Sequence, residues 1–378
     1  MTGSETGPET GPGPGAGAAK LRYGWTTGAC ATAATTAAYQ ALLTGEFPDP
    51  VTVHLPGGQT PAFALAVERR GAEDAMAGVV KDAGDDPDVT HGALIRATVR
   101  HAAPGSGVTF RAGPGVGTVT LPGLPLAVGE PAVNPVPRTL IREAVARVAG
   151  RYGGTGDVVV ELSVDDGAEI ARQTWNPRLG ILGGLSILGT TGIVIPYSCS
   201  AWIDSIRRGI DVAVATGETH VLGATGTTSE RVGAQLYGLS GTALLDMGDF
   251  AGALLKYLRR HPIPRLTVAG GFAKLSKLAD GRLDLHSGRS RINLAGLAER
   301  ALRVGASADL ADRIRAANTA LHALELARAE GVPLGDAVAE DARDAARDIL
   351  RGSPIEIGVD VVAIDRGGTI VGRAGVVP

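Results

Sequence analysis

The densest group of reactive side chains lies in the segment KDAGDDPDVTHG, residues 81–92. Its charged residues fall within eight positions: Lys81, Asp82, Asp85, Asp86 and Asp88. One carboxylate could accept or relay a proton, with Asp82 and Asp85 the leading candidates and Asp86 the third. Alternatively, these aspartates cap turns through their own backbone, which Asp-Pro and Gly-Asp sequences favour. A Mg²⁺ or Ca²⁺ site is a third interpretation, but the spacing does not match an EF-hand loop, so no metal is predicted.

Two glycine-rich segments could let a ligand approach the backbone closely, because glycine adopts positive φ without strain. The first is GILGGLSILGTTG at 180–192, whose candidate ligand contacts are Gly183, Gly184, Ser186, Gly189, Thr190 and Thr191. The second is HVLGATGTTSE at 220–230, where a strand should run into Gly223 and Gly226 before a helix begins. Asp246 ends the next expected strand, where an acidic side chain can bind ribose hydroxyls. The alternative for the second segment is a tight strand-to-helix connection.

The segment TTGAC places Thr26, Thr27 and Gly28 where an alanine-rich helix begins. Free amide groups and the helix dipole at that end could receive an anionic group. One of the threonines should also cap the helix. Cys30 falls in the first turn, where a thiol can have a lowered pKa, but it can equally be a small residue packed in the core.

The composition excludes several classes of partner and site. The chain of 378 residues carries 36 basic and 39 acidic residues, and its net charge of −3 argues against nucleic acid or an anionic membrane as the main partner. Cys30 and Cys199 lie far apart without metal-ligand spacing, which indicates neither a zinc site nor a disulfide framework. We therefore expect a reducing compartment, the cytoplasm.

Two segments need to be weighed as targeting or membrane sequences. Residues 1–19 lack the basic start and apolar centre of a secretory signal, and we expect a flexible, disordered tail there. The stretch from Leu179 to Ile203 has no charged residue and is long enough to span a bilayer. Its glycines, proline and hydroxyl side chains would disrupt a helix that faces lipid, so we expect a glycine-rich loop and no membrane contact.

The pattern of residues 20–172 predicts an α+β domain with a mostly antiparallel or mixed sheet. Short β-type runs, separated by Pro-Gly and Gly-Gly turns, are expected at residues 51–55, 63–69, 93–101 and 157–164. Helices are expected from Thr26 or Thr27 to about Gly45 and over residues 137–149.

Residues 173–378 predict a second domain that alternates strands, glycine turns and helices. This order is typical of a parallel, doubly wound sheet that binds a nucleotide-like ligand. The expected strands lie in HVLGATG, TALLDMG and RLTVAGG, and the expected helices cover 201–215, about 229 onward, 250–260, 273–279 and parts of 293–350. A hairpin at 358–376 closes the chain and could return to the first domain.

Five segments together resemble the cobalt-precorrin-5B (C1)-methyltransferases of cobalamin biosynthesis, the CbiD family. They are YGWTTGACATAA at 23–34, VVKDAGDDPDVTHG at 79–92, GEPAVNPVPR at 129–138, TWNPRLGILGGLSILGTTGIVIP at 174–196 and KLSKLADGRLDLHS at 274–287. They occur in the family's order and extend over about residues 20–290. The chain departs from the family's pattern at Ala29, where a second threonine is more usual, and in GGFAK at 270–274.

The resemblance implies two α/β domains, the first like the second domain of ribosomal protein S5 and the second Rossmann-like. It implies that S-adenosylmethionine donates a methyl group to C1 of cobalt-precorrin-5B, giving cobalt-precorrin-6A, and it does not imply a metal held by the protein. The partner is then a small-molecule tetrapyrrole rather than nucleic acid or membrane. A homodimer is left open as the assembly.

A tetrapyrrole of this class carries many carboxylates around a flat ring, so its site needs cations and amide donors. The candidate substrate contacts are Thr26, Thr27, Gly28, Cys30, Lys81, Arg138, Arg178, Lys274, His286 and Ser287. The base would be Asp82, Asp85 or Asp86. The donor would bind at the two glycine-rich segments, and the first is favoured because it lies in the longest matching motif.

Two other functions stay open at this point. A Rossmann-like half with a glycine turn and an acidic residue also suits a nucleotide-dependent oxidoreductase that uses NAD. A non-catalytic tetrapyrrole-binding protein would explain the cations, but it would not need a nucleotide-binding half.

Overall fold

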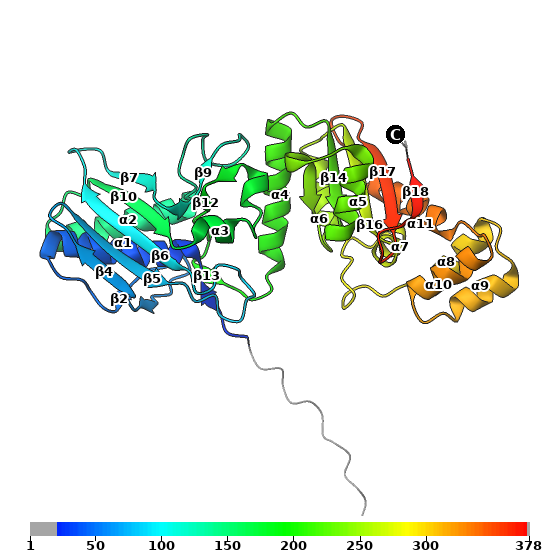
Figure 1. Ribbon diagram of the computed structural model, residues 1–378, viewed down its shortest axis with the longest axis horizontal. Helices are drawn as coiled ribbons and strands as arrows, with labels where there is room; N and C mark the ends of the chain where they lie inside the picture. The colour runs from blue at the N-terminus through cyan, green and yellow to red at the C-terminus, as the bar shows by residue number, and fades with distance from the viewer. Residues whose placement is uncertain (1–20, 376–378) are drawn as a thin grey trace, which may run out of the picture.

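The computed structural model describes residues 21–375, so the tail expected over residues 1–19 lies outside the described part. Figure 1 shows two lobes along the long axis of the molecule, with helix α4 (Cys199–Ala215) standing between them. Each lobe contains a five-stranded sheet and its own buried apolar core. The described chain is therefore a mixed α/β protein.

The first lobe is built on a mixed sheet with the strand order β4-β5-β6-β10-β7. Its strands are β4 (Val67–Arg70), β5 (Asp74–Val80), β6 (Leu94–His101), β10 (Val158–Val164) and β7 (Val108–Ala112). Neighbouring strands are antiparallel except β10 and β7, which run parallel. Helices α1 (Thr27–Thr44) and α2 (Pro135–Tyr152) pack against this sheet, and the short pair β2 (Val51–Thr52) and β3 (Ala62–Phe63) lies beside them.

Helix α1 fits into the core because its side chains are small. Thr26 caps it by accepting a hydrogen bond from the Ala29 amide at 3.2 Å, and Gly45 ends it with φ 86°. Most of its alanines are fully buried in the core shared with α2 and the sheet. Ala75 and Ala77 of β5, also 0% exposed, let the helix approach the sheet closely. The start of α1 is thereby held firmly beside the loop that follows β5.

The segment after residue 173 returns to the first lobe before the chain enters the second. Three short strands make this return: β11 (Ile181–Leu182) pairs with β9 (Thr118–Val119), β12 (Gly184–Leu185) with β8 (Gly115–Val116), and β13 (Ile193–Val194) with β1 (Gly24–Trp25). The alternation of elements predicts a second domain from residue 173, whereas these pairings keep the chain up to Val194 on the first lobe. Strands of two residues are too short to show a period, which is why the sequence pattern misplaces this segment.

The second lobe contains a sheet with the order β15-β14-β16-β17-β18, in which only β18 is antiparallel. Its strands are β14 (His220–Ala224), β15 (Leu244–Asp246), β16 (Arg265–Gly271), β17 (Gly358–Ile364) and β18 (Ile370–Ala374). The sheet is mostly parallel, as predicted. The closing hairpin adds β17 and β18 to this sheet, so it completes the second lobe and does not return to the first.

Helices cover both faces of the second sheet. Helix α5 (Thr227–Tyr237) packs on one face, while α4, α6 (Ala251–Leu258), α7 (Phe272–Ala279) and α11 (Leu334–Leu350) contribute to the core on the other. Helices α8 (Leu294–Arg303), α9 (Ala308–Arg315) and α10 (Ala320–Ala329) extend this core outward. Because β15 and β16 lie on opposite sides of β14, the connections diverge at the carboxyl end of β14, which is where doubly wound sheets bind ligands.

The sequence pattern does not predict β5 and β7 of the first five-stranded sheet, and it joins β3 and β4 into one expected strand. Strand β5 reads DAMAGVV, and alanine and glycine are weak strand formers, but small residues are needed there because α1 lies directly on them. Strand β7 lies at the edge of its sheet and has no fully buried residue, so alternation of burial cannot reveal it. The run expected over 63–69 falls into β3 and β4.

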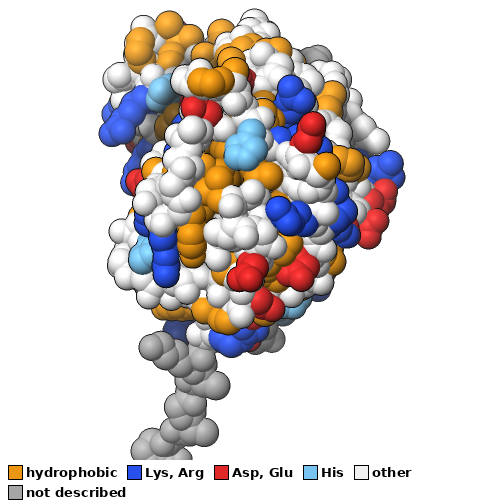
Figure 2. All heavy atoms as spheres, turned by 90° about the vertical axis from the view of Figure 1, so that its left-hand side faces the viewer, with side chains coloured by type: hydrophobic (Ala, Val, Ile, Leu, Met, Phe, Trp, Pro, Cys, Tyr) orange, Lys and Arg blue, Asp and Glu red, His pale blue; other side chains and the backbone are white. Residues whose placement is uncertain are grey.

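The surface charges and the hydropathy of the helices agree with the near-neutral composition of the chain. Figure 2 looks at the first lobe end-on and shows basic and acidic side chains interspersed with apolar ones on the described part of that face. Within residues 21–375, no helix combines the length and the apolar character that crossing a bilayer requires.

We expect Gly184→Ala to destabilise the protein, because a Cβ at this position would lie 2.2 Å from the backbone of Gly115 on the paired strand. The cost should be about 1–3 kcal/mol, the range for forced overpacking. Urea denaturation of the wild type and the variant measures it. Gly150→Ala is the matched control, since its Cβ would meet nothing within 4 Å in helix α2, and it should be neutral or stabilising. Equal stability of Gly184→Ala and wild type would contradict the close approach.

Candidate active site

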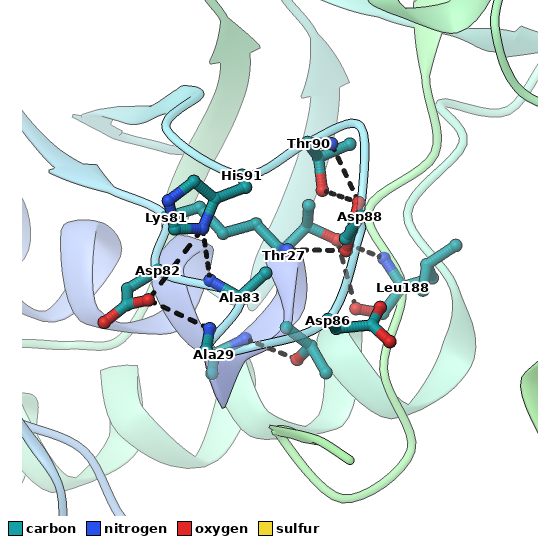
Figure 3. Close-up of polar contacts among 12 residues, drawn as sticks. Thr27, Ala29, Lys81, Asp82, Ala83, Asp86, Asp88, Thr90, His91 and Leu188 are labelled. Carbon is teal, nitrogen blue, oxygen red and sulfur yellow. Dashed lines mark hydrogen bonds and ion pairs between the residues drawn. The ribbon is translucent and has the colours of Figure 1, made fainter. Parts of the chain in front are cut away.

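The acidic loop of residues 81–92 joins β5 to β6 beside the start of α1 (Figure 3). Lys81 is 1% exposed, and its ammonium donates to Asp88 Oδ2 at 2.7 Å. Asp88 also accepts from the amide and the hydroxyl of Thr90. Burial alone would raise the pKa of Asp88, but the Lys81 charge and these hydrogen bonds outweigh it and lower the pKa. Lys81 therefore anchors the loop from inside rather than offering a cation to a ligand.

Asp82 is held by a cation that the sequence pattern does not reveal. Arg22 grips both carboxylate oxygens of Asp82, with one contact at 2.9 Å, and Gly84 donates its amide to the same group. The hydrogen bond from Arg22 is the main cause that lowers the pKa of Asp82 to about 2. A carboxylate with so low a pKa is a weak proton acceptor at neutral pH.

Asp85 and Asp86 each receive a backbone amide from another segment. Arg22 donates its amide to Asp85 Oδ2 at 2.6 Å, and Tyr197 donates its amide to Asp86 Oδ1 at 2.7 Å. His91 closes the loop by accepting the Ala83 amide on Nδ1 at 3.1 Å. These contacts favour the alternative in which the aspartates fix backbone. Within residues 21–375, no group of three or more His, Cys, Asp or Glu side chains is arranged to hold a metal ion.

The start of α1 is closed by its own chain. The amides of Gly28 and Ala29 donate to the Leu188 carbonyl at 2.9 Å and to Thr26 Oγ1 at 3.2 Å, and Thr27 Oγ1 bonds the backbone of Leu188. These amides, which the sequence offers as an anion site, are therefore already used. Cys30 is 0% exposed, and burial raises the pKa of its thiol to about 12. Cys30 is packed in the core and presents nothing to a substrate.

Arg138 also points inward, contrary to its predicted role as a carboxylate contact. Its guanidinium donates to the carbonyls of Val133 at 2.7 Å and Pro131 at 3.1 Å, and it pairs with Glu130 at 2.7 Å. It therefore fastens the GEPAVNP turn to the start of α2. The guanidinium thereby satisfies two backbone carbonyls and one carboxylate of the turn, which accounts for Arg138 in this motif without a ligand.

The glycines of residues 180–192 let this backbone pack closely against neighbouring side chains. A Cβ on Gly189 would lie 2.3 Å from Thr26 Oγ1, and one on Gly192 would lie 2.5 Å from Leu55. Ser186 is buried and donates to Asn176 Oδ1 at 3.2 Å. Gly183, Thr190 and Thr191 are exposed, and the Thr191 hydroxyl bonds the backbone of Ile193. This loop packs over the start of α1 and lies on the first lobe, away from the parallel sheet.

The second glycine segment lies at the carboxyl edge of the parallel sheet, as predicted. Ala224 and Asp246 are paired across β14 and β15, and Gly226 begins α5 just beyond. Gly223 lies inside β14, where a Cβ would come 2.4 Å from Leu254, so its role is packing rather than ligand approach. Lys274 reaches the same edge, donating to the Thr225 carbonyl at 2.9 Å and pairing with Asp249 at 3.0 Å.

A cavity of about 250 Å³ opens at this edge, between the two lobes. It is lined by Arg172 and Gln173, by Thr174, Trp175 and Arg178 of the return segment (residues 174–194), and by Thr227, Glu230 and Asp246 from the second lobe. Arg178 forms a bidentate pair with Glu230 at 2.7 and 2.8 Å and stacks over Trp175. Burial raises the pKa of Asp246, and the nearby Glu230 carboxylate adds to the effect.

Other predicted contacts lie apart from this cavity. His286 and Ser287 are exposed on the loop after α7, and His286 Nδ1 accepts the Gly288 amide. A second cavity, of about 710 Å³, is lined by residues 344–357 at the amino edge of the parallel sheet and contains none of the predicted residues. Apart from Arg138, His286 and Ser287, the structure thus groups the predicted residues into two sets, one around the acidic loop with the start of α1 and one around the cavity.

Three residues near these sets have no counterpart among the predictions: Arg22, Tyr197 and Glu230. Arg22 and Tyr197 are distant in sequence from the acidic loop, and no spacing connects them to it. Glu230 was within reach, because an acidic residue in the first turn of a helix beside a glycine turn is a recognisable pattern.

We expect Asp88→Ala to lower the free energy of unfolding by about 3 kcal/mol, because it leaves the Lys81 charge buried and unpaired. A Lys81→Met, Asp88→Ala double variant should recover part of the loss. Since the folded-state pKa of Asp88 is lowered, the pair stabilises the protein above about pH 4 and loses its effect as the pH falls further. Urea denaturation measures both. Asp165→Ala, which removes the exposed pair with Arg96, is the control and should cost less than about 1 kcal/mol.

Comparison of the chain with family models and known proteins identifies its family. One family model, described as CbiD, matches residues 15–196, and another, described as CbiD, C-terminal domain, matches residues 284–375. A solved structure of the cobalamin biosynthesis protein CbiD from Archaeoglobus fulgidus is 28% identical, covers 72% of this chain and 84% of its own, and superposes with a TM-score of 0.40.

Curated relatives match along almost the whole chain. Cobalt-precorrin-5B C(1)-methyltransferase from Paramagnetospirillum magneticum is 62% identical over 94% of this chain and 98% of its own length. The protein of the same name from Rhodospirillum rubrum is 61% identical with the same coverage, and that from Brucella canis is 59% identical over 94% and 96%. The resemblance carried by the five motifs is confirmed, and this chain belongs to the CbiD family, whose curated members are cobalt-precorrin-5B C(1)-methyltransferases.

Proposed function

We propose that this protein transfers a methyl group from S-adenosylmethionine to C1 of cobalt-precorrin-5B, giving cobalt-precorrin-6A in corrin-ring biosynthesis. The family and the identity of about 60% to curated C(1)-methyltransferases support this reaction. The observation that carries the donor site is the cavity at the carboxyl edge of β14 and β15. There, Thr227 and Asp246 of the second lobe face Arg178, and Gly226 directly precedes Thr227 at the start of α5.

The strand order supports the Rossmann-like character of the second lobe. Numbered from β14, the parallel strands run 2-1-3-4 across the sheet, which is a doubly wound order with its crevice between strands 1 and 3. Gly226 and Lys274 lie at the ends of these two strands. We assign the first lobe, with two helices packed on its mixed sheet, to the domain type of ribosomal protein S5 domain 2.

The residues of the cavity suit the donor chemically. The Asp246 carboxylate can accept hydrogen bonds from ribose hydroxyls, and Gly226 leaves the first amides of α5 without a side-chain cap. The donor supplies an electrophilic methyl group on a sulfonium, and the carbon–sulfur bond breaks as the bond to C1 forms. What the chain must do is hold the two reactants in line and near contact, which accounts for a large part of a rate enhancement.

The charge of the cavity argues against the NAD alternative. Two guanidiniums line the cavity, but Arg178 is paired with Glu230 and Arg172 with Glu169, which leaves the Asp246 carboxylate to set the local charge. A pyrophosphate with two negative charges would meet repulsion there, whereas a sulfonium cation would meet attraction. The cavity also lies at the carboxyl edge of the parallel sheet, where doubly wound sheets bind nucleotide-like ligands. A non-catalytic tetrapyrrole-binding protein has no cosubstrate and would not need such a site.

Methylation at C1 releases a proton, and its removal does not require a strong base from the acidic loop. Asp82 has a pKa of about 2, and Asp85 and Asp86 already accept backbone amides. Of the predicted roles in the site, that of these three aspartates as the base therefore has the least support. The tetrapyrrole as partner follows from the proposed reaction, and the cytoplasmic location and a homodimer stay predictions.

We expect wild-type protein to bind S-adenosylhomocysteine and not NADH in isothermal titration calorimetry. Asp246→Asn should weaken S-adenosylhomocysteine binding about tenfold or more, because it removes a charged hydrogen-bond acceptor for the ribose. Thr191→Ala, in the other glycine-rich segment, is the control and should bind like wild type.

The reverse pattern, with a loss only in Thr191→Ala, would move the donor to the first lobe. No binding of S-adenosylhomocysteine by the wild type would refute the proposed function. Binding of NADH instead would favour the oxidoreductase.

A further inference from the structure

Tyr197 has a backbone conformation that a non-glycine residue rarely adopts. Its φ is 57°, and Asp166 is the other described non-glycine residue with a positive φ. This conformation costs free energy, typically about 1 kcal/mol or more for a residue with a Cβ. The side chain gains no burial in return, since 68% of Tyr197 is exposed. A strained, exposed aromatic residue indicates a function that folding does not require.

The acidic loop holds this strained backbone in place. The Tyr197 amide donates to Asp86 Oδ1 at 2.7 Å, across 111 positions of sequence. The preceding Pro196 is buried, which fixes the chain on the other side. Asp86 lies in the same loop as the buried Lys81–Asp88 pair (Figure 3), so the acceptor itself is well anchored. The direction of Tyr197 is therefore set by the first lobe.

Tyr197 lies between the two sets of predicted residues, those around the acidic loop and those around the cavity. Helix α4 begins two residues later, and its Trp202 donates Nε1–H to the carbonyl of Asp246 at 3.2 Å. Cys199, between them, is 3.4 Å from the guanidinium of Arg289. The start of α4 thus lies between the acidic loop and the strand edge to which we assign the donor.

The surroundings of Tyr197 match a flat ring with acidic substituents. Four large apolar residues between 188 and 202 are well exposed: Leu188 at 48%, Ile195 at 53%, Tyr197 at 68% and Trp202 at 42%. Arg289 is half exposed and stands beside them, where a substrate carboxylate could join its pair with Asp284. Apolar faces with a cation at the margin complement a macrocycle that carries carboxylates on its rim.

We propose that Tyr197 is a substrate-binding residue whose ring packs against the flat face of the tetrapyrrole beside the donor edge, and that Asp86 is the positioning residue that holds it there. This inference rests on the proposed function. It also gives Asp86 a part that differs from the predicted base: the carboxylate sets the direction of an aromatic ring and takes no proton.

Steady-state methyl transfer to cobalt-precorrin-5B tests the proposal. Tyr197→Ala should raise the KM for the tetrapyrrole about tenfold, the loss expected for one well-packed aromatic contact, with kcat little changed. Tyr197→Phe should behave like wild type. Tyr197→Gly should lose affinity like Tyr197→Ala, yet be at least as stable to urea, because glycine adopts φ 57° without strain. That variant separates loss of contact from loss of folding.

The Asp86 variants distinguish positioning from base catalysis. Asp86→Asn keeps an oxygen that accepts the Tyr197 amide and should retain near wild-type KM and kcat, whereas Asp86→Ala should raise KM as Tyr197→Ala does. A fall of kcat in both Asp86 variants would overturn the positioning role in favour of the base.

Binding of S-adenosylhomocysteine by the same variants keeps the two proposals apart. It should be unchanged in all of them. Unaltered KM in Tyr197→Ala, with the spent donor still bound, would overturn the inference and leave the proposed function standing. Failure of the wild type to bind the spent donor would refute the proposed function itself.

Discussion

The architecture depends on one close packing contact, where the glycine-rich backbone of residues 180–192 passes over β8 and the start of α1. Gly184 lies against Gly115, and Gly189 lies against Thr26, at separations that leave no room for a Cβ. This contact keeps the chain on the first lobe until Val194. It fixes where Arg178 meets the second lobe and where α4 begins. The glycines of this motif thus locate the cavity between the lobes without lining it.

Charge pairs then set the details of the site. The buried Lys81–Asp88 pair holds the acidic loop, and Arg22 and the Tyr197 amide occupy its other carboxylates. Within the described residues, this loop therefore acts as a clamp between α1 and the start of α4. Across the cavity, Arg178 and Glu230 connect the lobes through a bidentate pair that is partly screened from water. Such pairs are stronger than exposed ones because fewer water molecules compete for them.

Local patterns predicted much of the fold. The capped α1, the mostly parallel second sheet and the place of Asp246 at a strand end all follow from spacing and periodicity. Strand β5 and the return of residues 174–194 were beyond reach, because alanine-rich or two-residue strands carry no period. Among site residues, the packed position of Cys30 agrees with one of the two interpretations that its sequence context allows, whereas the inward contacts of Arg138 could not be foreseen, because the neighbours of a charge in a matching motif are not known from the sequence. The roles of the remaining candidates stay predictions.

The two thiols of the chain differ in accessibility, so the region where the two lobes meet can be labelled selectively. Cys30 is enclosed in the first core, and its pKa of about 12 keeps it protonated, so alkylating reagents that attack thiolates should pass it by. Cys199 is partly accessible in the first turn of α4, beside Arg289. A thiol-reactive spectroscopic label should therefore attach to Cys199 alone, at the point where both lobes meet. Neither cysteine would have to be substituted first.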